Sequence, residues 1–178
     1  ENQTSLDLAV MASTELFLKI DKYSIDFVIY CTQSPEYYLP SGSALIQKKL
    51  FPNKNIGSFD INQGCSGFVY SLLVAKSLIE NNLANCILVI TSDTYSKFID
   101  ENDYSNKSIF ADGSSASIVS SDKKIKEHFF NFDCGTDGNG SENLIYPNSG
   151  IKKSKKEKKL FMNGPEILKF ALERIPIS

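Results

Sequence analysis

The residues best suited to covalent chemistry lie around Cys65, in the stretch SFDINQGCSGFVYSLL (58–73). An extended apolar run gives way there to a helical pattern, which predicts a cysteine at a strand-to-helix turn. The free N–H groups at a helix start favour a thiolate, and the N–H of Cys65 is placed to donate to an oxyanion. Gly64 and Gly67 permit a sharp turn and close approach of a substrate carbonyl. From the local sequence alone, a nucleophilic thiol and a small packed residue are equally plausible.

The other cysteines and the single histidine are weaker candidates. Cys31 and Cys86 lie inside strand-like apolar runs, where we expect burial, and Cys134 lies in a loop. His128 is the only imidazole, and nothing in the sequence places it beside Cys65, so we expect a structural or surface role. The absence of CxxC, GxSxG and GxxxxGK motifs argues against a zinc site, a serine triad and a phosphate loop. We expect no metal, and no cofactor-binding residue is identified.

Alternating strand and helix patterns from Thr4 to Asp93 must position this cysteine. They predict an α/β fold with a mixed, mostly parallel sheet and helices on both faces. The expected strands span 25–32, 56–61, 86–93, 115–121 and 128–133. Helices are expected after a Thr4 cap, from a Ser41 cap to Leu50, from Ser66 to Asn81, and from a first turn containing Pro165. No strand precedes the opening helix, so we expect the chain to be a segment of something larger.

Composition limits the remaining possibilities. The chain has 178 residues, 42% of them apolar, and a formal net charge of −2, which suits one globular domain and argues against disorder or a nucleic-acid-binding surface. The lysine-rich run at 152–159 is interpreted as a solvated loop. No apolar run approaches the roughly 20 residues that span a bilayer. The four cysteines lack the short spacings of disulfide or zinc scaffolds, which favours a reduced, cytoplasmic setting.

Several segments, in order, resemble the β-ketoacyl-acyl carrier protein synthase III family of the thiolase superfamily. They are SIDFVIYCTQSPEYYLPSGSALIQKKL (24–50), FDINQGCSGFVYSL (59–72), CILVITSD (86–93), SIFADGSSASIV (108–119) and FMNGPEILKFAL (161–172). The resemblance implies a thiolase-like fold, one half of a layered αβαβα architecture. It also implies that residues 1–178 form an N-terminal half without its first strand. The family's catalytic histidine and asparagine are then expected in the second half.

The same resemblance implies a function. Cys65 takes the family's acyl-accepting position, receiving an acyl group from acyl-CoA or acyl carrier protein. The acyl-enzyme then condenses with malonyl-acyl carrier protein as carbon dioxide leaves, and no cofactor is implied beyond these thioester substrates. A homodimer is expected through the proline loop 36–40 and the strand beginning at Ile56. Departures from the family pattern at Leu39, at 62–64 and at Ala111 leave acyl-chain preference open.

Other functions fit the same pattern. A different thiolase-type synthase, such as a hydroxymethylglutaryl-CoA synthase or a polyketide or quinolone starter enzyme, would share the nucleophile segment. A noncatalytic module that binds acyl carrier protein or forms a dimer would keep the fold without the chemistry. A hydrolase is less favoured, because no residue of this chain is identified as a base that activates water for release of the acyl group.

Overall fold

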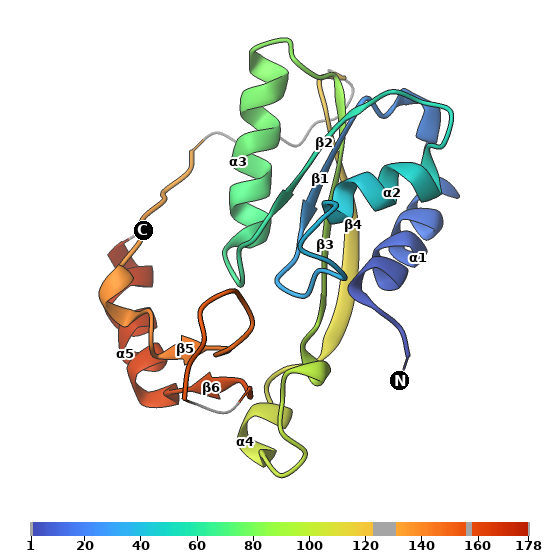
Figure 1. Ribbon diagram of the computed structural model, residues 1–178. Helices are drawn as coiled ribbons and strands as arrows, with labels where there is room; N and C mark the ends of the chain where they lie inside the picture. The colour runs from blue at the N-terminus through green and yellow to red at the C-terminus, as the bar shows by residue number, and fades with distance from the viewer. Residues whose placement is uncertain (1, 123–130, 156–157, 178) are drawn as a thin grey trace. The chain divides into compact units, whose positions relative to one another are not determined.

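The computed structural model describes residues 2–122, 131–155 and 158–177. The chain forms two compact units (Figure 1). The first contains Glu1–Thr94 and Asp112–Phe132, and the second contains Tyr95–Ala111 and Asp133–Ser178. His128 lies outside the described residues, so the structural or surface role expected for it stays a prediction.

The first unit is built on a sheet with strand order β2-β1-β3-β4. These strands are β1 (Phe27–Cys31), β2 (Gly57–Ile61), β3 (Cys86–Thr94) and β4 (Asp112–Ser120). The central strand β1 pairs in parallel with β2 and β3, whereas β4 runs antiparallel to β3. The predicted mixed, mostly parallel sheet is therefore confirmed, and β4 begins earlier than expected. Of the strand expected at 128–133, the described residues 131–133 are not in a strand.

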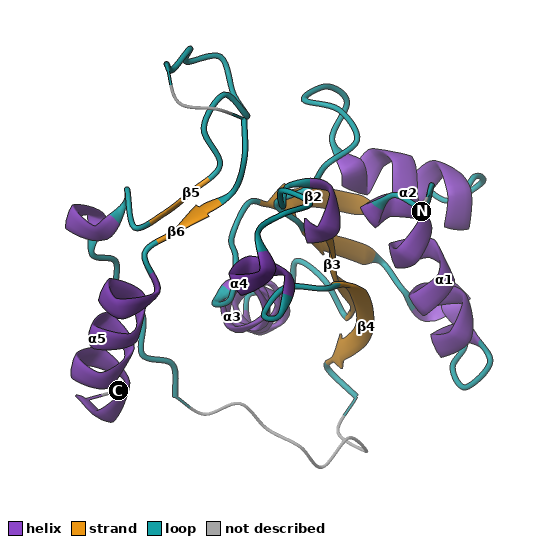
Figure 2. Ribbon diagram, turned by 90° about the horizontal axis from the view of Figure 1, so that it is seen from below, coloured by secondary structure: helices purple, strands orange, loops and turns teal. Residues whose placement is uncertain are grey.

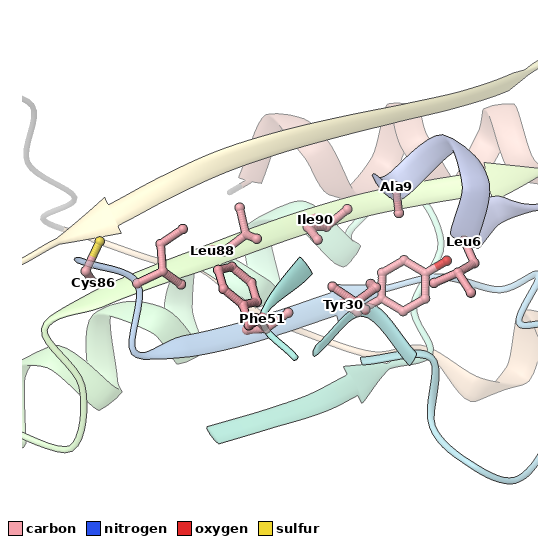
Figure 3. Packing of buried hydrophobic residues seen from close by; sticks show 10 residues of the cluster. Leu6, Ala9, Tyr30, Phe51, Cys86, Leu88 and Ile90 are labelled. Atoms are coloured by element: carbon pink, nitrogen blue, oxygen red, sulfur yellow. The ribbon is translucent and has the colours of Figure 1, made fainter. Parts of the chain in front are cut away.

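Helices cover both faces of this sheet, as predicted (Figure 2). Helices α1 (Ser5–Phe17) and α2 (Gly42–Leu50) pack on one face, and α3 (Gly67–Glu80) packs on the other. Figure 3 shows the hydrophobic cluster on the face covered by α1 and α2, in which Tyr30 of β1 lies beside Leu6 of α1 and Leu88 of β3 lies beside Phe51, just after α2. Because β1 and β3 are covered on both faces, their sequences are nearly continuous apolar runs.

Helix α1 begins as the sequence predicts, but α2 begins differently. Thr4 and Asp7 form a reciprocal capping box at the start of α1. Ser41 occupies the N-cap position of α2 without a side-chain capping bond. Asp60 of β2 takes that role, accepting hydrogen bonds from the N–H groups of Gly42 at 2.6 Å and Ser43 at 2.7 Å. The predicted N-cap position and helix end are therefore confirmed, but the Ser41 side chain does not cap the helix, because a carboxylate on the neighbouring strand satisfies the donors.

The second unit contains short elements around an aromatic cluster. They are α4 (Tyr104–Lys107), the paired strands β5 (Leu144–Ile145) and β6 (Phe161–Met162), and α5 (Gly164–Arg174). This unit also has 3-10 turns at Tyr95–Lys97, Gly138–Gly140 and Ile175–Ile177, and the first unit has one at Lys22–Ser24. Phe98 stacks on Tyr146 with ring centroids 4.5 Å apart. Pro165 lies in the first turn of α5, as predicted. Within the part of the chain that the structure describes, no helix has the length and apolar character needed to cross a membrane.

Candidate active site

Cys65 lies at the strand-to-helix turn that the sequence predicts. Strand β2 ends at Ile61, α3 begins at Gly67, and the N–H of Gly67 donates to the Gly64 carbonyl at 2.8 Å to close the turn. The thiol is free and exposed. Cys31 and Cys86 are buried, as expected for strand residues, and Cys134 is exposed. The turn therefore presents Cys65 to solvent at the carboxyl end of a parallel strand, where ligands of α/β sheets commonly bind.

Gly67 is required by packing against β1. A Cβ at this position would lie 2.3 Å from the Sγ of Cys31, which is too close for any side chain. Among the described residues no glycine has a positive φ, so a left-handed backbone is not the reason for this glycine. The close approach that Gly67 permits is that of helix α3 to the buried Cys31 thiol. This packing is sufficient to explain Gly67, so the expected role in the approach of a substrate stays a prediction.

Gly64 lies against the segment that follows β1. A Cβ here would lie 2.8 Å from the Oε1 of Gln33. The Cys31 thiol also donates to the Gln63 carbonyl at 3.4 Å, and burial raises the pKa of Cys31. The residues before and after the candidate nucleophile are thus both in contact with the carboxyl end of β1.

Asp93, near the end of β3, holds the segment after β1 in place. Its Oδ1 accepts hydrogen bonds from the Gln33 N–H at 2.8 Å, the Ser34 hydroxyl at 2.9 Å and the Thr32 hydroxyl at 3.2 Å. The Ser34 hydroxyl in turn accepts from the Thr94 N–H at 2.9 Å. Burial raises the pKa of Asp93, although these donors act in the opposite direction. Asp93 was not among the predicted site residues, although it is an acidic residue that closes the apolar run CILVITSD.

The start of α3 is suited to stabilising negative charge. No side-chain hydrogen bond caps this helix end, and its first turn carries no acidic residue. A thiolate on Cys65 or an oxyanion formed beside it would therefore meet the positive end of the helix dipole without a competing carboxylate on that turn. In the described ranges no group of three or more His, Cys, Asp or Glu residues could hold a metal ion.

Asp112 and Gly113, which lie in the segment SIFADGSSASIV (108–119), begin β4. They pair in register with Thr94 and Asp93. Both are exposed, and a Cβ on Gly113 would meet no atom within 4 Å. Packing among the described residues does not explain this glycine.

Comparisons with known proteins match the nucleophile segment and the fold. The model of the 3-oxoacyl-[acyl-carrier-protein (ACP)] synthase III family matches residues 59–138, which include Cys65. A β-ketoacyl-[acyl-carrier-protein] synthase III of Fusobacterium nucleatum is 32% identical over 99% of this chain and 56% of its own length. One from Coxiella burnetii is 37% identical over 88% of this chain and 48% of its own length.

A solved structure of a 3-oxoacyl-(acyl-carrier-protein) synthase III superimposes with a TM-score of 0.92 at 36% identity, covering 98% of this chain and 57% of that one. The chain thus spans about half the length of the relatives it matches. The chain is therefore similar to 3-oxoacyl-[acyl-carrier-protein] synthase III over nearly its whole length, including the Cys65 segment, and it has a thiolase-like α/β fold.

Proposed function

We propose that this protein is an acyltransferase of fatty-acid or related acyl-chain biosynthesis, and that Cys65 carries the acyl group. The observation that supports this most directly is the exposed thiol on the turn between β2 and α3, inside the segment that matches the family. The substrates are acyl thioesters of coenzyme A or acyl carrier protein. They are reactants, and no separate cofactor is required.

The first step transfers the acyl group to the protein. The Cys65 thiolate attacks the thioester carbonyl carbon, a new C–S bond forms, and the carbonyl electrons move to oxygen. N–H groups at the start of α3 stabilise that oxyanion. The tetrahedral intermediate then collapses, the bond to the donor sulfur breaks, and the released thiolate takes up the proton that Cys65 gave up. Covalent catalysis divides a difficult acyl transfer into two easier steps.

The second step forms the carbon-carbon bond. The malonyl thioester loses carbon dioxide, and the resulting enolate carbon attacks the acyl-Cys65 carbonyl, expelling the thiolate and giving a 3-oxoacyl product. The enolate needs positioned donors. We propose that residues 1–178 are the N-terminal, nucleophile-bearing half of a condensing enzyme and that the family's histidine and asparagine lie outside them. The one histidine of this chain, His128, is outside the described residues.

A homodimer in the cytoplasm is part of the same proposal. Strand β2 is an edge of the four-stranded sheet, which leaves backbone groups that a second copy can pair. The nearby proline loop exposes large apolar side chains, with Tyr37 59%, Tyr38 73% and Leu39 86% exposed. Exposed apolar groups of this kind commonly mark partner surfaces.

Release of coenzyme A tests the proposed acyl transfer. On mixing with acetyl-CoA, the protein is expected to release a burst of free coenzyme A close to one equivalent per chain. Cys65→Ser should abolish this burst, whereas Cys134→Ser, which changes the other exposed cysteine, should preserve it. A burst that survives in Cys65→Ser would overturn the assignment, and no burst in any variant would favour a noncatalytic module.

A further inference from the structure

We propose that Asp93 is a positioning residue for Cys65, acting through the segment Thr32–Ser34 that follows β1. This inference rests on the proposed function, since it concerns how the acyl-accepting turn is held. Asp93 is far from Cys65 in sequence, and its proposed role is to hold the segment and not to contact the substrate. Its effect is transmitted by two sets of contacts, one from Asp93 to the segment and one from the segment to the turn.

The first set fixes the segment to the end of β3. One carboxylate oxygen of Asp93 accepts from the Gln33 N–H at 2.8 Å, the Ser34 hydroxyl at 2.9 Å and the Thr32 hydroxyl at 3.2 Å. The N–H of Thr94 donates to the Ser34 hydroxyl at 2.9 Å. Thr32, Ser34 and Thr94 are buried, so these bonds are shielded from competing water. The segment therefore has one well-determined conformation.

The second set joins that segment to the turn that carries Cys65. The Gln33 side chain lies over Gly64, where a Cβ would come within 2.8 Å of its Oε1. Immediately before the segment, the Cys31 thiol donates to the Gln63 carbonyl and lies where a Cβ on Gly67 would clash. The turn is thus supported on both sides of Cys65, by Gln33, whose backbone N–H donates to Asp93, and by Cys31 of β1, the residue before the segment that Asp93 holds.

This support matters because acyl transfer requires the sulfur and the helix N–H groups to meet one carbonyl group in a fixed geometry. A displacement of about 1 Å in such a constellation can reduce a rate by about a hundredfold. Loss of the support should lower the maximal rate of acyl transfer more than it weakens the binding of the thioester, because binding of the remote part of the substrate does not depend on the turn.

The chain contains a matched control carboxylate at the opposite end of the same strands. Asp26, just before β1, accepts hydrogen bonds from the Cys86 N–H at 3.0 Å, the Asn85 N–H at 2.8 Å and the Asn85 side chain at 3.2 Å. Asp26 and Asp93 therefore each join β1 to β3 through three hydrogen bonds, at the amino end and the carboxyl end respectively. Only Asp93 lies at the end of the sheet that bears Cys65.

The test measures the rate of acyl transfer from acetyl-CoA to the protein. Reactions at a range of acetyl-CoA concentrations are quenched at short times, and the acylated protein is quantified. We expect Asp93→Ala to lower the maximal rate about tenfold or more, with a change of less than about twofold in the half-saturating concentration. Asp93→Asn, which keeps an acceptor oxygen, should recover most of the rate. Asp26→Ala should retain the wild-type rate even if it unfolds more easily.

Gln33→Ala provides a second route to the same answer if Asp93→Ala does not fold. This variant keeps the backbone N–H that donates a hydrogen bond to Asp93, but it removes the side chain that lies over Gly64. We expect its maximal rate of acyl transfer to be several-fold lower. Gln47→Ala, which removes an amide that bonds to Phe51 and Lys54 in the loop after α2, is its control and should react as wild type. Wild-type rates in both Gln33→Ala and Asp93→Ala, or equal losses in Asp93→Ala and Asp26→Ala, would overturn the inference alone. Absence of an acyl adduct in the wild type would overturn the proposed function and this inference with it.

Discussion

Tyr30 carries a polar group that the surrounding core does not satisfy. Its side chain is 1% exposed, and no partner within the described residues meets its hydroxyl in good hydrogen-bond geometry, although Ser5 and Thr32 act on its pKa as hydrogen-bonding neighbours. A buried polar group without a hydrogen bond destabilises the folded state. Tyr30→Phe should therefore leave the free energy of unfolding at pH 7 unchanged or raise it by about 1 kcal/mol. Chemical denaturation of the two proteins measures this difference. A loss of more than about 1 kcal/mol would show that the hydroxyl makes a bond that this account lacks.

The same tyrosine predicts a dependence of stability on alkaline pH. Burial raises the pKa of Tyr30 from 10.0 to about 12 in the folded state. The folded protein therefore holds the phenol proton at pH values where the unfolded chain has lost it. This contribution to stability is fully present below pH 10 and is lost as the pH rises toward 12. Denaturation midpoints measured at pH 9 and pH 11 should fall less in Tyr30→Phe than in wild type, and equal slopes would contradict this.

The junction between β1 and α3 depends on the absence of a side chain at Gly67. Gly67→Ala would place a Cβ 2.3 Å from the Cys31 Sγ, so the helix or the thiol must move. Such overpacking typically costs about 1–3 kcal/mol. Replacing Cys31 by Ala removes the clashing sulfur, and the double variant Cys31→Ala/Gly67→Ala should be destabilised by less than the sum of the single changes. Additive losses in denaturation experiments would mean that the two residues do not conflict.

The start of α2 depends on Asp60 of the neighbouring strand. Its two carboxylate oxygens accept from the N–H groups of Gly42 and Ser43, which Ser41 leaves uncapped. We expect Asp60→Ala to lower the free energy of unfolding by about 0.5–2 kcal/mol, the range measured for loss of an N-cap. Ser41→Ala is the matched control and should change stability little. A larger effect of Ser41→Ala in thermal or chemical unfolding would reverse this assignment.

These elements show which features the sequence can predict. β1 and β3 were predicted because continuous apolar runs and parallel pairing go together, and α1 because Thr4 and Asp7 form a local capping box. The Asp60 cap could not be predicted, because it joins residues far apart in sequence through the sheet register. The two-residue strands β5 and β6 are too short to produce a periodic pattern. The turn that carries Cys65 was predicted because its sequence signals are local, whereas the hydrogen bonds of Asp93 join residues about 60 positions apart.

Across the whole molecule, the proposal predicts a division of chemistry. The 178-residue chain should form an acyl adduct but should not release carbon dioxide from malonyl-acyl carrier protein, because removal of a single oxyanion donor already costs about a hundredfold or more in rate. The isolated chain, with Cys65→Ser as control, is assayed for labelled carbon dioxide. Release that depends on Cys65 would show that the condensing donors lie within these residues.

The residue that receives the acyl group distinguishes Cys65 from the other three thiols. After incubation with isotopically labelled acetyl-CoA and quenching in acid, the protein is digested and its cysteine-containing peptides are analysed by mass spectrometry. We expect the label on Cys65, with Cys31, Cys86 and Cys134 unlabelled, because Cys65 alone combines exposure with a place at the start of α3. Label distributed over Cys65 and Cys134 alike, or confined to Cys134, would contradict the assignment of Cys65 as the acyl-accepting nucleophile.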